Sequence, residues 1–179
     1  RAQLPDRAVF GFCGAPFTLA AYMVEGGGSK TFPKFSEFVK NSPKAFGTLM
    51  EALCEAAEEY ALMQSECGID AFQIFDSNAL LIPDGGYWEL SGKWNARILG
   101  ALKGRAKTFL FTPLGAGRFP ETAAAGADAY SVYTGNDLAA IRRANQGDYA
   151  LQGNLDPLLL SRASPAEVAE RAREIIASQ

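Results

Sequence analysis

The chain has 179 residues, a formal net charge of -3 and 48% hydrophobic residues. This length suits one domain, and the apolar fraction is high enough for a packed core, so a disordered chain is excluded. The slight negative charge argues against nucleic acid as the main partner, because phosphate binding needs a basic surface. No apolar run approaches the roughly 20 residues that a membrane-spanning helix needs, so we expect no membrane partner.

The chain contains three cysteines and no histidine. Cys13, Cys54 and Cys67 are widely spaced and form no CxxC pair, which favours a reducing compartment and a role as small core residues. The lack of histidine excludes a Ser-His-Asp or Cys-His catalytic device built from this chain alone, and any His-ligated metal site. We therefore predict no metal site within the chain.

The first element predicted along the chain is a strand. Residues 9–13 form a short apolar run closed by Gly14, which predicts a buried strand. Residues 18–24 predict a short helix. Residues 25–30 contain three successive glycines and predict a loop, because glycine is costly inside a regular element.

A long amphipathic helix is predicted next. Ser42 is a candidate N-cap, and Pro43 suits the first helical position. Apolar residues then recur at three- and four-residue spacing, which places them on one face. Gly68 is expected to end the helix as a C-terminal glycine.

From residue 70 onward, short apolar runs alternate with helical patterns. We predict strands at residues 70–75, 108–111, 129–132 and 149–152, and helices at residues 84–103, 120–125 and 137–145. Asp156 before a proline predicts another helix start, and Ser164 with Glu167 forms a capping box for the last helix. Alternating strands and helices imply parallel pairing. The strands lack an alternating polar pattern, which predicts burial on both faces.

These patterns amount to about five strand–helix units in a single domain, residues 1–179. A closed (β/α)₈ barrel takes eight units. We predict an α/β fold of the (β/α)₈ TIM-type barrel class, of which this chain supplies about five βα units. An open doubly wound sheet is the alternative, and it would be complete at this length. We expect a central fragment of a longer protein, because the chain lacks a starting methionine and ends in helical sequence.

Polar side chains follow the predicted strands at the points where they end. Asp76, Ser77 and Asn78 come directly after one strand, Tyr22 follows the first strand, and Asn154 follows the last. In either architecture ligands bind beyond the carboxyl ends of the strands, so these residues predict the wall of a polar pocket. As an alternative, Asp76 and Ser77 would merely cap the next helix, and the sequence alone favours neither interpretation.

Three segments together resemble the uroporphyrinogen decarboxylase family. They are residues 14–30 (GAPFTLAAYMVEGGGSK), residues 73–77 (QIFDS) and residues 151–157 (LQGNLDP). They occur in the family's order, and the resemblance covers almost the whole chain. It implies a (β/α)₈ barrel lyase of heme biosynthesis that decarboxylates the four acetate side chains of uroporphyrinogen III to give coproporphyrinogen III. It also implies no metal, no organic cofactor, a homodimer and a cytoplasmic location, or a plastid if the source is a photosynthetic eukaryote.

The resemblance also assigns site residues. The family's pocket tyrosine falls on Tyr22 and its pocket serine on Ser77, and both would bind substrate through their hydroxyl groups. Residues 26–30 would shape the mouth of the cleft, where we expect Lys30 to meet a substrate carboxylate. No catalytic residue is assigned, because the family's pyrrole-binding aspartate lies in an earlier strand outside this chain. The family's arginine-rich N-terminal motif and C-terminal histidine are also outside it.

Some segments depart from the family pattern. Residues 107–113 (KTFLFTP) have threonine and proline where many members carry a lysine-glycine turn, and residues 130–135 (YSVYTG) lack the usual Asp-Trp pair. These departures leave open a relative that acts on another substrate. Two rivals are a related zinc-dependent corrinoid methyltransferase and a catalytically silent fragment that binds a tetrapyrrole.

Overall fold

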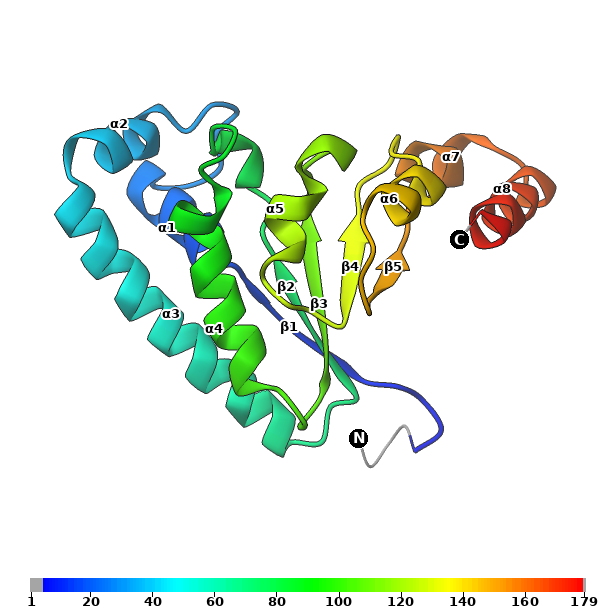
Figure 1. Cartoon of the computed structure of the whole chain (residues 1–179), viewed down its shortest axis with the longest axis horizontal. Coiled ribbons are helices and arrows are strands. Elements are labelled where there is room, and N and C mark those ends of the chain that lie inside the picture. Colours follow the sequence, from blue (N-terminus) through cyan, green and yellow to red (C-terminus); the bar gives the residue numbers. More distant parts are fainter. Residues whose placement is uncertain (1–4, 179) are drawn as a thin grey trace.

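A computed structural model of the chain describes residues 5–178. Its strands are β1 (Phe10–Gly14), β2 (Ala71–Phe75), β3 (Lys107–Thr112), β4 (Ala129–Val132) and β5 (Ala150–Gln152). Its α-helices are α1 (Pro16–Glu25), α2 (Pro33–Asn41), α3 (Pro43–Glu66), α4 (Lys93–Ala101), α5 (Phe119–Ala123), α6 (Leu138–Ala144), α7 (Pro157–Arg162) and α8 (Pro165–Ala177). Short helical turns η1 (Ala79–Leu81), η2 (Trp88–Gly92) and η3 (Ala116–Arg118) connect them, and Figure 1 shows their arrangement.

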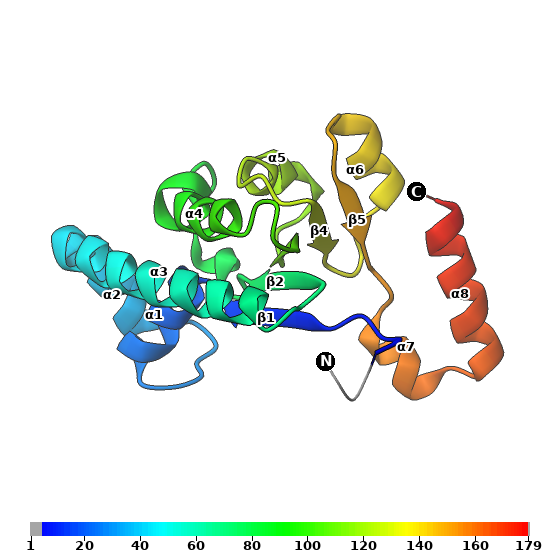
Figure 2. The same cartoon turned by 90° about the horizontal axis from the view of Figure 1, so that it is seen from below.

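The strands within residues 5–178 form one parallel sheet with the order β1-β2-β3-β4-β5. Sequential order distinguishes a barrel from a doubly wound sheet, in which the order reverses at a switch point. Right-handed crossovers between strands in sequential order place every helix on the same face. Figure 2 shows helices α3 to α6 along one side of the row of strands. The prediction of five barrel units is confirmed, and the strands of the described residues form an open row that does not close into a barrel.

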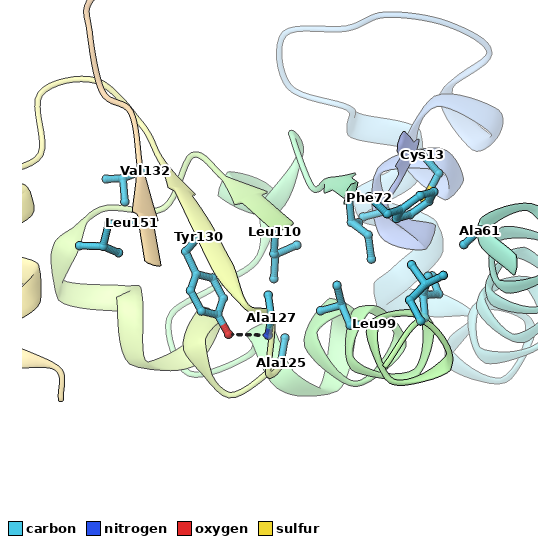
Figure 3. Packing of buried hydrophobic residues seen from close by; sticks show 14 of the residues in the cluster. Cys13, Ala61, Phe72, Leu99, Leu110, Ala125, Ala127, Tyr130, Val132 and Leu151 are labelled. Carbon is cyan, nitrogen blue, oxygen red and sulfur yellow. Dashed lines mark hydrogen bonds between the residues drawn. The ribbon is translucent and has the colours of Figure 1, made fainter. Parts of the chain in front are cut away.

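The covered face of the sheet holds the main core. Phe72, Ile74 and Leu110 are fully buried, and Leu99 of α4 belongs to the same cluster. Figure 3 shows Phe72, Leu110 and Leu99 between the sheet and the helices. The buried Tyr130 hydroxyl accepts the N–H of residue 127 at 2.9 Å and donates to the carbonyl of residue 123 at 2.8 Å. Both polar roles of this hydroxyl are therefore satisfied, as a buried position requires.

A second core lies between α1, α2 and α3. Phe17 packs edge-on against Phe35 and Phe46, with ring centroids 5.0 Å and 6.4 Å apart. Such tilted contacts are favourable because the ring edge of one aromatic group meets the electron-rich face of another. This core anchors α1 beyond the carboxyl end of β1, where Tyr22 lies.

Within residues 5–178 no helix covers the opposite face of the sheet, so the predicted burial of both faces is wrong for the described residues. In β1, Gly11 and Cys13 are buried, whereas Phe10 and Phe12 are exposed. The burial pattern alternates because the helices cover one face alone. The apolar sequence of these strands reflects large aromatic side chains on the uncovered face.

Helix boundaries were predicted well where capping residues mark them. The capping box at Ser164 is present, with its hydroxyl accepting the Glu167 N–H at 3.4 Å and the Glu167 carboxylate accepting the Ser164 N–H at 2.7 Å. Asp137 and Asp156 cap α6 and α7 through their side chains. Gly68 follows α3 with φ of 81°, a left-handed conformation that glycine adopts without steric cost.

Two helix predictions need correction, and one helix was missed. The helix predicted from residue 84 begins at residue 87, because a turn at Gly85, with φ of 75°, precedes it. Helix α2 was not predicted at all. Ser42 precedes α3 as expected, but its side chain makes no capping hydrogen bond. The same residue ends α2, with its N–H bonded to the Phe38 carbonyl at 2.9 Å, which holds its backbone away from standard capping geometry.

Candidate functional site at the carboxyl ends of the strands

The parallel strands all end at one edge of the sheet, and the predicted site residues lie beyond that edge. Tyr22 is on the last turns of α1, and 46% of its surface is exposed. Ser77 is the second residue after the end of β2 and is also exposed. No hydrogen bond or ring contact joins their side chains in the part of the chain that the structure describes. Their convergence on a single cavity therefore stays a prediction.

The glycine-rich loop after α1 has a defined shape. Gly26 and Gly27 have φ of 86° and 150°, and their N–H groups both bond to the Tyr22 carbonyl, at 3.0 Å and 3.1 Å. The Ser29 hydroxyl accepts the Phe32 N–H at 3.1 Å, which leads the chain into α2. These bonds hold the exposed Lys30 at the tip of a structured loop. Its contact with a substrate carboxylate stays a prediction.

Asp76 and Ser77 do not cap a helix. The N-cap position of the next turn, η1, is Asn78, and no side chain caps it. Asp76 is fully buried and faces the helices, whereas Ser77 is exposed. The interpretation of the whole triplet as one pocket wall is therefore wrong for Asp76 and Asn78, because both are buried. The alternation of β2 continues to Asp76, which is buried like Ile74, whereas Ser77 begins a turn and is exposed.

The Asp76 carboxyl group is the centre of a buried hydrogen-bond network. It accepts from the Thr18 hydroxyl at 3.1 Å, from the Ser91 hydroxyl at 2.7 Å and from the Asn95 amide at 3.2 Å. The Asn95 amide also donates to the Tyr87 hydroxyl at 3.1 Å. These groups come from α1, η2, α4 and the segment before η2, so the network ties four parts of the chain to the end of β2.

Burial decides the ionisation of this network. It raises the pKa of Asp76 above its ordinary value, although the hydrogen bonds from Ser91 and its other partners oppose the shift. Burial and the neighbouring Asp76 also raise the pKa of Tyr87 well above its usual range. Within residues 5–178 no cation forms an ion pair with Asp76. A buried carboxyl group without a cation retains its proton more readily than an exposed one.

The uncovered face of the sheet carries a row of aromatic rings toward the carboxyl ends of the strands. Phe12 and Phe75 have ring centroids 6.0 Å apart, Phe75 and Phe111 are 5.9 Å apart, and Phe111 and Tyr133 are 6.4 Å apart. We call these four residues the aromatic row. Sequence analysis missed it, although the signal was an aromatic residue near the end of three successive strands and just after a fourth.

A chain of polar side chains crosses the same face. The Gln73 amide donates to the Ser131 hydroxyl at 3.1 Å, and the Ser131 hydroxyl donates to the Gln152 carbonyl oxygen. These residues lie on β2, β4 and β5, so the chain spans β3. The uncovered face therefore combines large rings with hydrogen-bonding groups, which is the typical lining of a ligand site.

Two asparagines connect the ends of β3, β4 and β5. Asn136 accepts the Ala116 N–H at 2.9 Å, and Asn154 donates to the carbonyls of Asn136 at 2.7 Å and Tyr133 at 3.1 Å. Gly153 precedes Asn154 with φ of 108°, and a side chain there would lie 2.9 Å from the Val132 carbonyl oxygen. The sequence at this strand end thus requires glycine followed by an amide.

A polar cavity of about 690 Å³ opens between α6, α7 and α8. Thr134 and Asn154 line it together with Asp156, and Arg171 of α8 lies at its wall. Polar residues after β4 and β5 therefore do share a hollow. Tyr22 and Ser77 are not among the residues that line this cavity.

The cysteines offer no nucleophile in the buried core. Burial, reinforced by Cys54, raises the pKa of the Cys13 thiol to about 12. Burial likewise raises the pKa of Cys54 to about 11, against the opposing charge of Arg97. Both are core residues as predicted, whereas Cys67 is exposed. Within the described residues no three His, Cys, Asp or Glu side chains are grouped so as to hold a metal ion.

Comparison with known proteins decides the family. The sequence profile described as uroporphyrinogen decarboxylase matches residues 1–179. The chain belongs to the uroporphyrinogen decarboxylase family. It is 36% identical to a uroporphyrinogen decarboxylase of Helicobacter pylori over 158 residues, which are 87% of this chain and 46% of the relative. It is 37% identical to one of Saccharophagus degradans over an alignment 184 residues long, which covers 99% of this chain and 52% of the relative.

This member of the uroporphyrinogen decarboxylase family spans about half the length of the curated relatives it matches. Its fold is similar to that of a methyltransferase from Methanosarcina mazei, with a TM-score of 0.84 over 97% of this chain and 51% of that protein. Sequence identity to that structure is 17%, so the likeness supports the fold alone. No helix within residues 5–178 combines the length and the apolar character needed to cross a membrane.

Proposed function

We propose that the polypeptide carrying this chain decarboxylates the four acetate side chains of uroporphyrinogen III to give coproporphyrinogen III. Membership of the family supports the reaction. The structural observation that carries the proposal is the aromatic row on the uncovered face of the sheet, whose Phe75 ends β2 two residues before the exposed Ser77. A macrocycle of four pyrrole rings has the size and apolar faces to lie against such rings.

The reaction suits a site without an assigned cofactor. Loss of carbon dioxide leaves an electron pair on the acetate carbon, and this pair is unstable unless an electron sink accepts it. A pyrrole ring that has first been protonated is such a sink, so the substrate supplies it. The protein must then bind an anionic substrate and stabilise the positive charge on the ring. We assign no residue of this chain to the proton transfer.

Hydroxyl groups are proposed to orient the substrate. Tyr22 and Ser77 lie beyond neighbouring strands, β1 and β2, and neither hydroxyl has a partner in the described part of the chain. Both are therefore free to donate a hydrogen bond to a substrate carboxylate or to accept one from a pyrrole N–H. Lys30, at the tip of the glycine-rich loop, is proposed to attract the carboxylates that surround the macrocycle.

The test measures turnover of uroporphyrinogen III by the polypeptide as expressed from its own gene. Tyr22→Phe and Ser77→Ala are each expected to lower kcat/KM about tenfold, the effect of losing one hydrogen bond to a charged group. Tyr60→Phe is the matched control, since Tyr60 is an α3 residue with a similar exposed fraction, 50%. Unchanged kcat/KM in both site variants, with folding intact, would remove Tyr22 and Ser77 from the substrate site.

The rivals are distinguished by separate measurements. A zinc-dependent methyltransferase has only the fold likeness behind it, and stoichiometric zinc in the purified polypeptide would favour it. Binding of the tetrapyrrole without turnover would favour a silent binding protein. The homodimer and the cytoplasmic or plastid location implied by the family are proposals as well. Sedimentation equilibrium tests the first, and a fluorescent fusion in the source cell tests the second.

A further inference from the structure

The end of β2 places a buried residue, an exposed residue and another buried residue in succession. Asp76 and Asn78 are buried, and Ser77 between them is exposed. The position of the Ser77 side chain is fixed only if Asp76 and Asn78, its two neighbours, are themselves held in place. Both are held by the same group, because the Thr18 hydroxyl donates to the Asp76 carboxyl at 3.1 Å and accepts the Asn78 N–H at 3.1 Å.

The remaining donors all converge on the same carboxyl group. Ser91 and Asn95 bond to one oxygen of Asp76, at 2.7 Å and 3.2 Å, while Thr18 bonds to the other. The Asp76 N–H bonds to the Phe111 carbonyl at 2.9 Å, which continues the pairing of β2 with β3. The side chain and the backbone of Asp76 are therefore both restrained, and rotation of the segment that carries Ser77 would break several buried bonds.

We propose that Asp76 is a positioning residue for Ser77, acting through the buried hydrogen bonds from Thr18, Ser91 and Asn95. This inference rests on the proposed function, because the role of Ser77 in substrate binding belongs to that proposal. Asp76 does not touch the substrate, since it is fully buried on the helix-covered side. Its effect on turnover passes through the geometry of Ser77.

A double-mutant cycle tests this role. Asp76→Asn keeps the size of the side chain, and it is expected to lower kcat/KM about tenfold, chiefly through a higher KM. In the Ser77→Ala background the same substitution is expected to change kcat/KM less than about twofold, because the group that it positions is already absent. A purely structural role of Asp76 would give the same factor in both backgrounds, which would overturn the inference.

Thr18 provides an independent form of the test if Asp76→Asn does not fold. Thr18→Val removes the hydroxyl that bridges Asp76 and Asn78 but keeps the carboxyl group, so it should give the same non-additive cycle with Ser77→Ala. Thr18→Ser retains the hydroxyl and should restore most of the lost kcat/KM. Thr48→Val on α3 is the matched control, because that hydroxyl bonds only to the Lys44 carbonyl. No rescue by Thr18→Ser would overturn the inference.

The outcome separates this inference from the function on which it rests. If Ser77→Ala alone leaves kcat/KM unchanged, Ser77 is not part of the substrate site, and the role of Asp76 is overturned with it. If Ser77→Ala lowers kcat/KM but Asp76→Asn acts equally in both backgrounds, the site stands and only the positioning role is overturned. Thermal unfolding of each variant shows that the compared proteins are folded.

Discussion

The two faces of the sheet use similar residues for different purposes. On the covered face of β2, Phe72 and Ile74 are fully buried against the helices. On the uncovered face of the same strand, Gln73 is partly buried and Phe75 is 37% exposed. Apolar character alone therefore does not identify the core in this protein. The contacts of each ring decide whether it stabilises the fold or is available to a ligand.

The same contrast holds for polar residues. Asp76 and Ser91 form bonds on the covered side, inside the protein, whereas Gln73 and Ser131 form bonds on the uncovered side. Water can replace a lost partner on the uncovered side but not in the interior. Hydrogen bonds of similar length should therefore contribute unequally to stability.

Replacement of an aromatic side chain by alanine should show the largest difference between the two faces in the free energy of unfolding. Phe72→Ala is expected to lower the free energy of unfolding by about 3–5 kcal/mol, because it leaves a cavity in a packed core. Phe75→Ala should cost less than half as much, since its ring is partly solvated before the change. Urea unfolding of both variants measures the difference. Equal losses would mean that the uncovered face contributes to the core as much as the covered face does.

Removal of a hydroxyl group should show a smaller difference between the two faces in the free energy of unfolding. Ser91→Ala is expected to lower the free energy of unfolding by about 1–3 kcal/mol, because it leaves the buried carboxyl group of Asp76 with one hydrogen-bond donor fewer. Ser131→Ala should cost about 1 kcal/mol or less, since its partner Gln152 is exposed and water replaces the bond. Urea unfolding of the two variants provides the comparison. A larger loss for Ser131→Ala would contradict the assignment of the faces.

The pH dependence of stability should show the smallest effect. Burial raises the pKa of Asp76, so the folded state retains this proton to a higher pH than the unfolded state does. The stability that Asp76 contributes is complete below its unfolded pKa, about 3.9, and is lost as pH rises through the raised folded pKa. The slope for one proton is at most about 1.4 kcal/mol per pH unit.

The Asp76→Asn variant isolates this contribution, because the amide does not titrate. Urea unfolding between pH 4 and pH 8 should show a decline in the wild type that is absent, or smaller, in the variant. Parallel curves for the two proteins would indicate that Asp76 has an ordinary pKa in the folded state.

Local signals in the sequence predicted much of the fold because they act over a few residues. The capping box at Ser164, the helix start at Asp156 and the helix-ending Gly68 were each predicted correctly. Each of these features satisfies backbone groups within one turn of its own residue. Ser42 was the exception, because two helices share it and its backbone serves both.

The site was predictable only in part. The position of Ser77 at a strand end followed from the sequence, as did that of Tyr22 on the helix after β1. The burial of Asp76 did not, because its partners Thr18 and Asn95 are 58 and 19 residues away along the chain. Nor did the aromatic row, since its rings come from separate strands and meet only through the register of the sheet.

By itself, the sequence determined the alternation of strands and helices, the residues at the strand ends and the family, because these depend on local pattern and on similarity to relatives. Only the tertiary structure decided which face of each strand the helices cover. That choice follows from the sequential strand order, whose right-handed crossovers place the helices on one side. It sends Asp76 into the interior and leaves Ser77 exposed, although the two residues are neighbours in the chain.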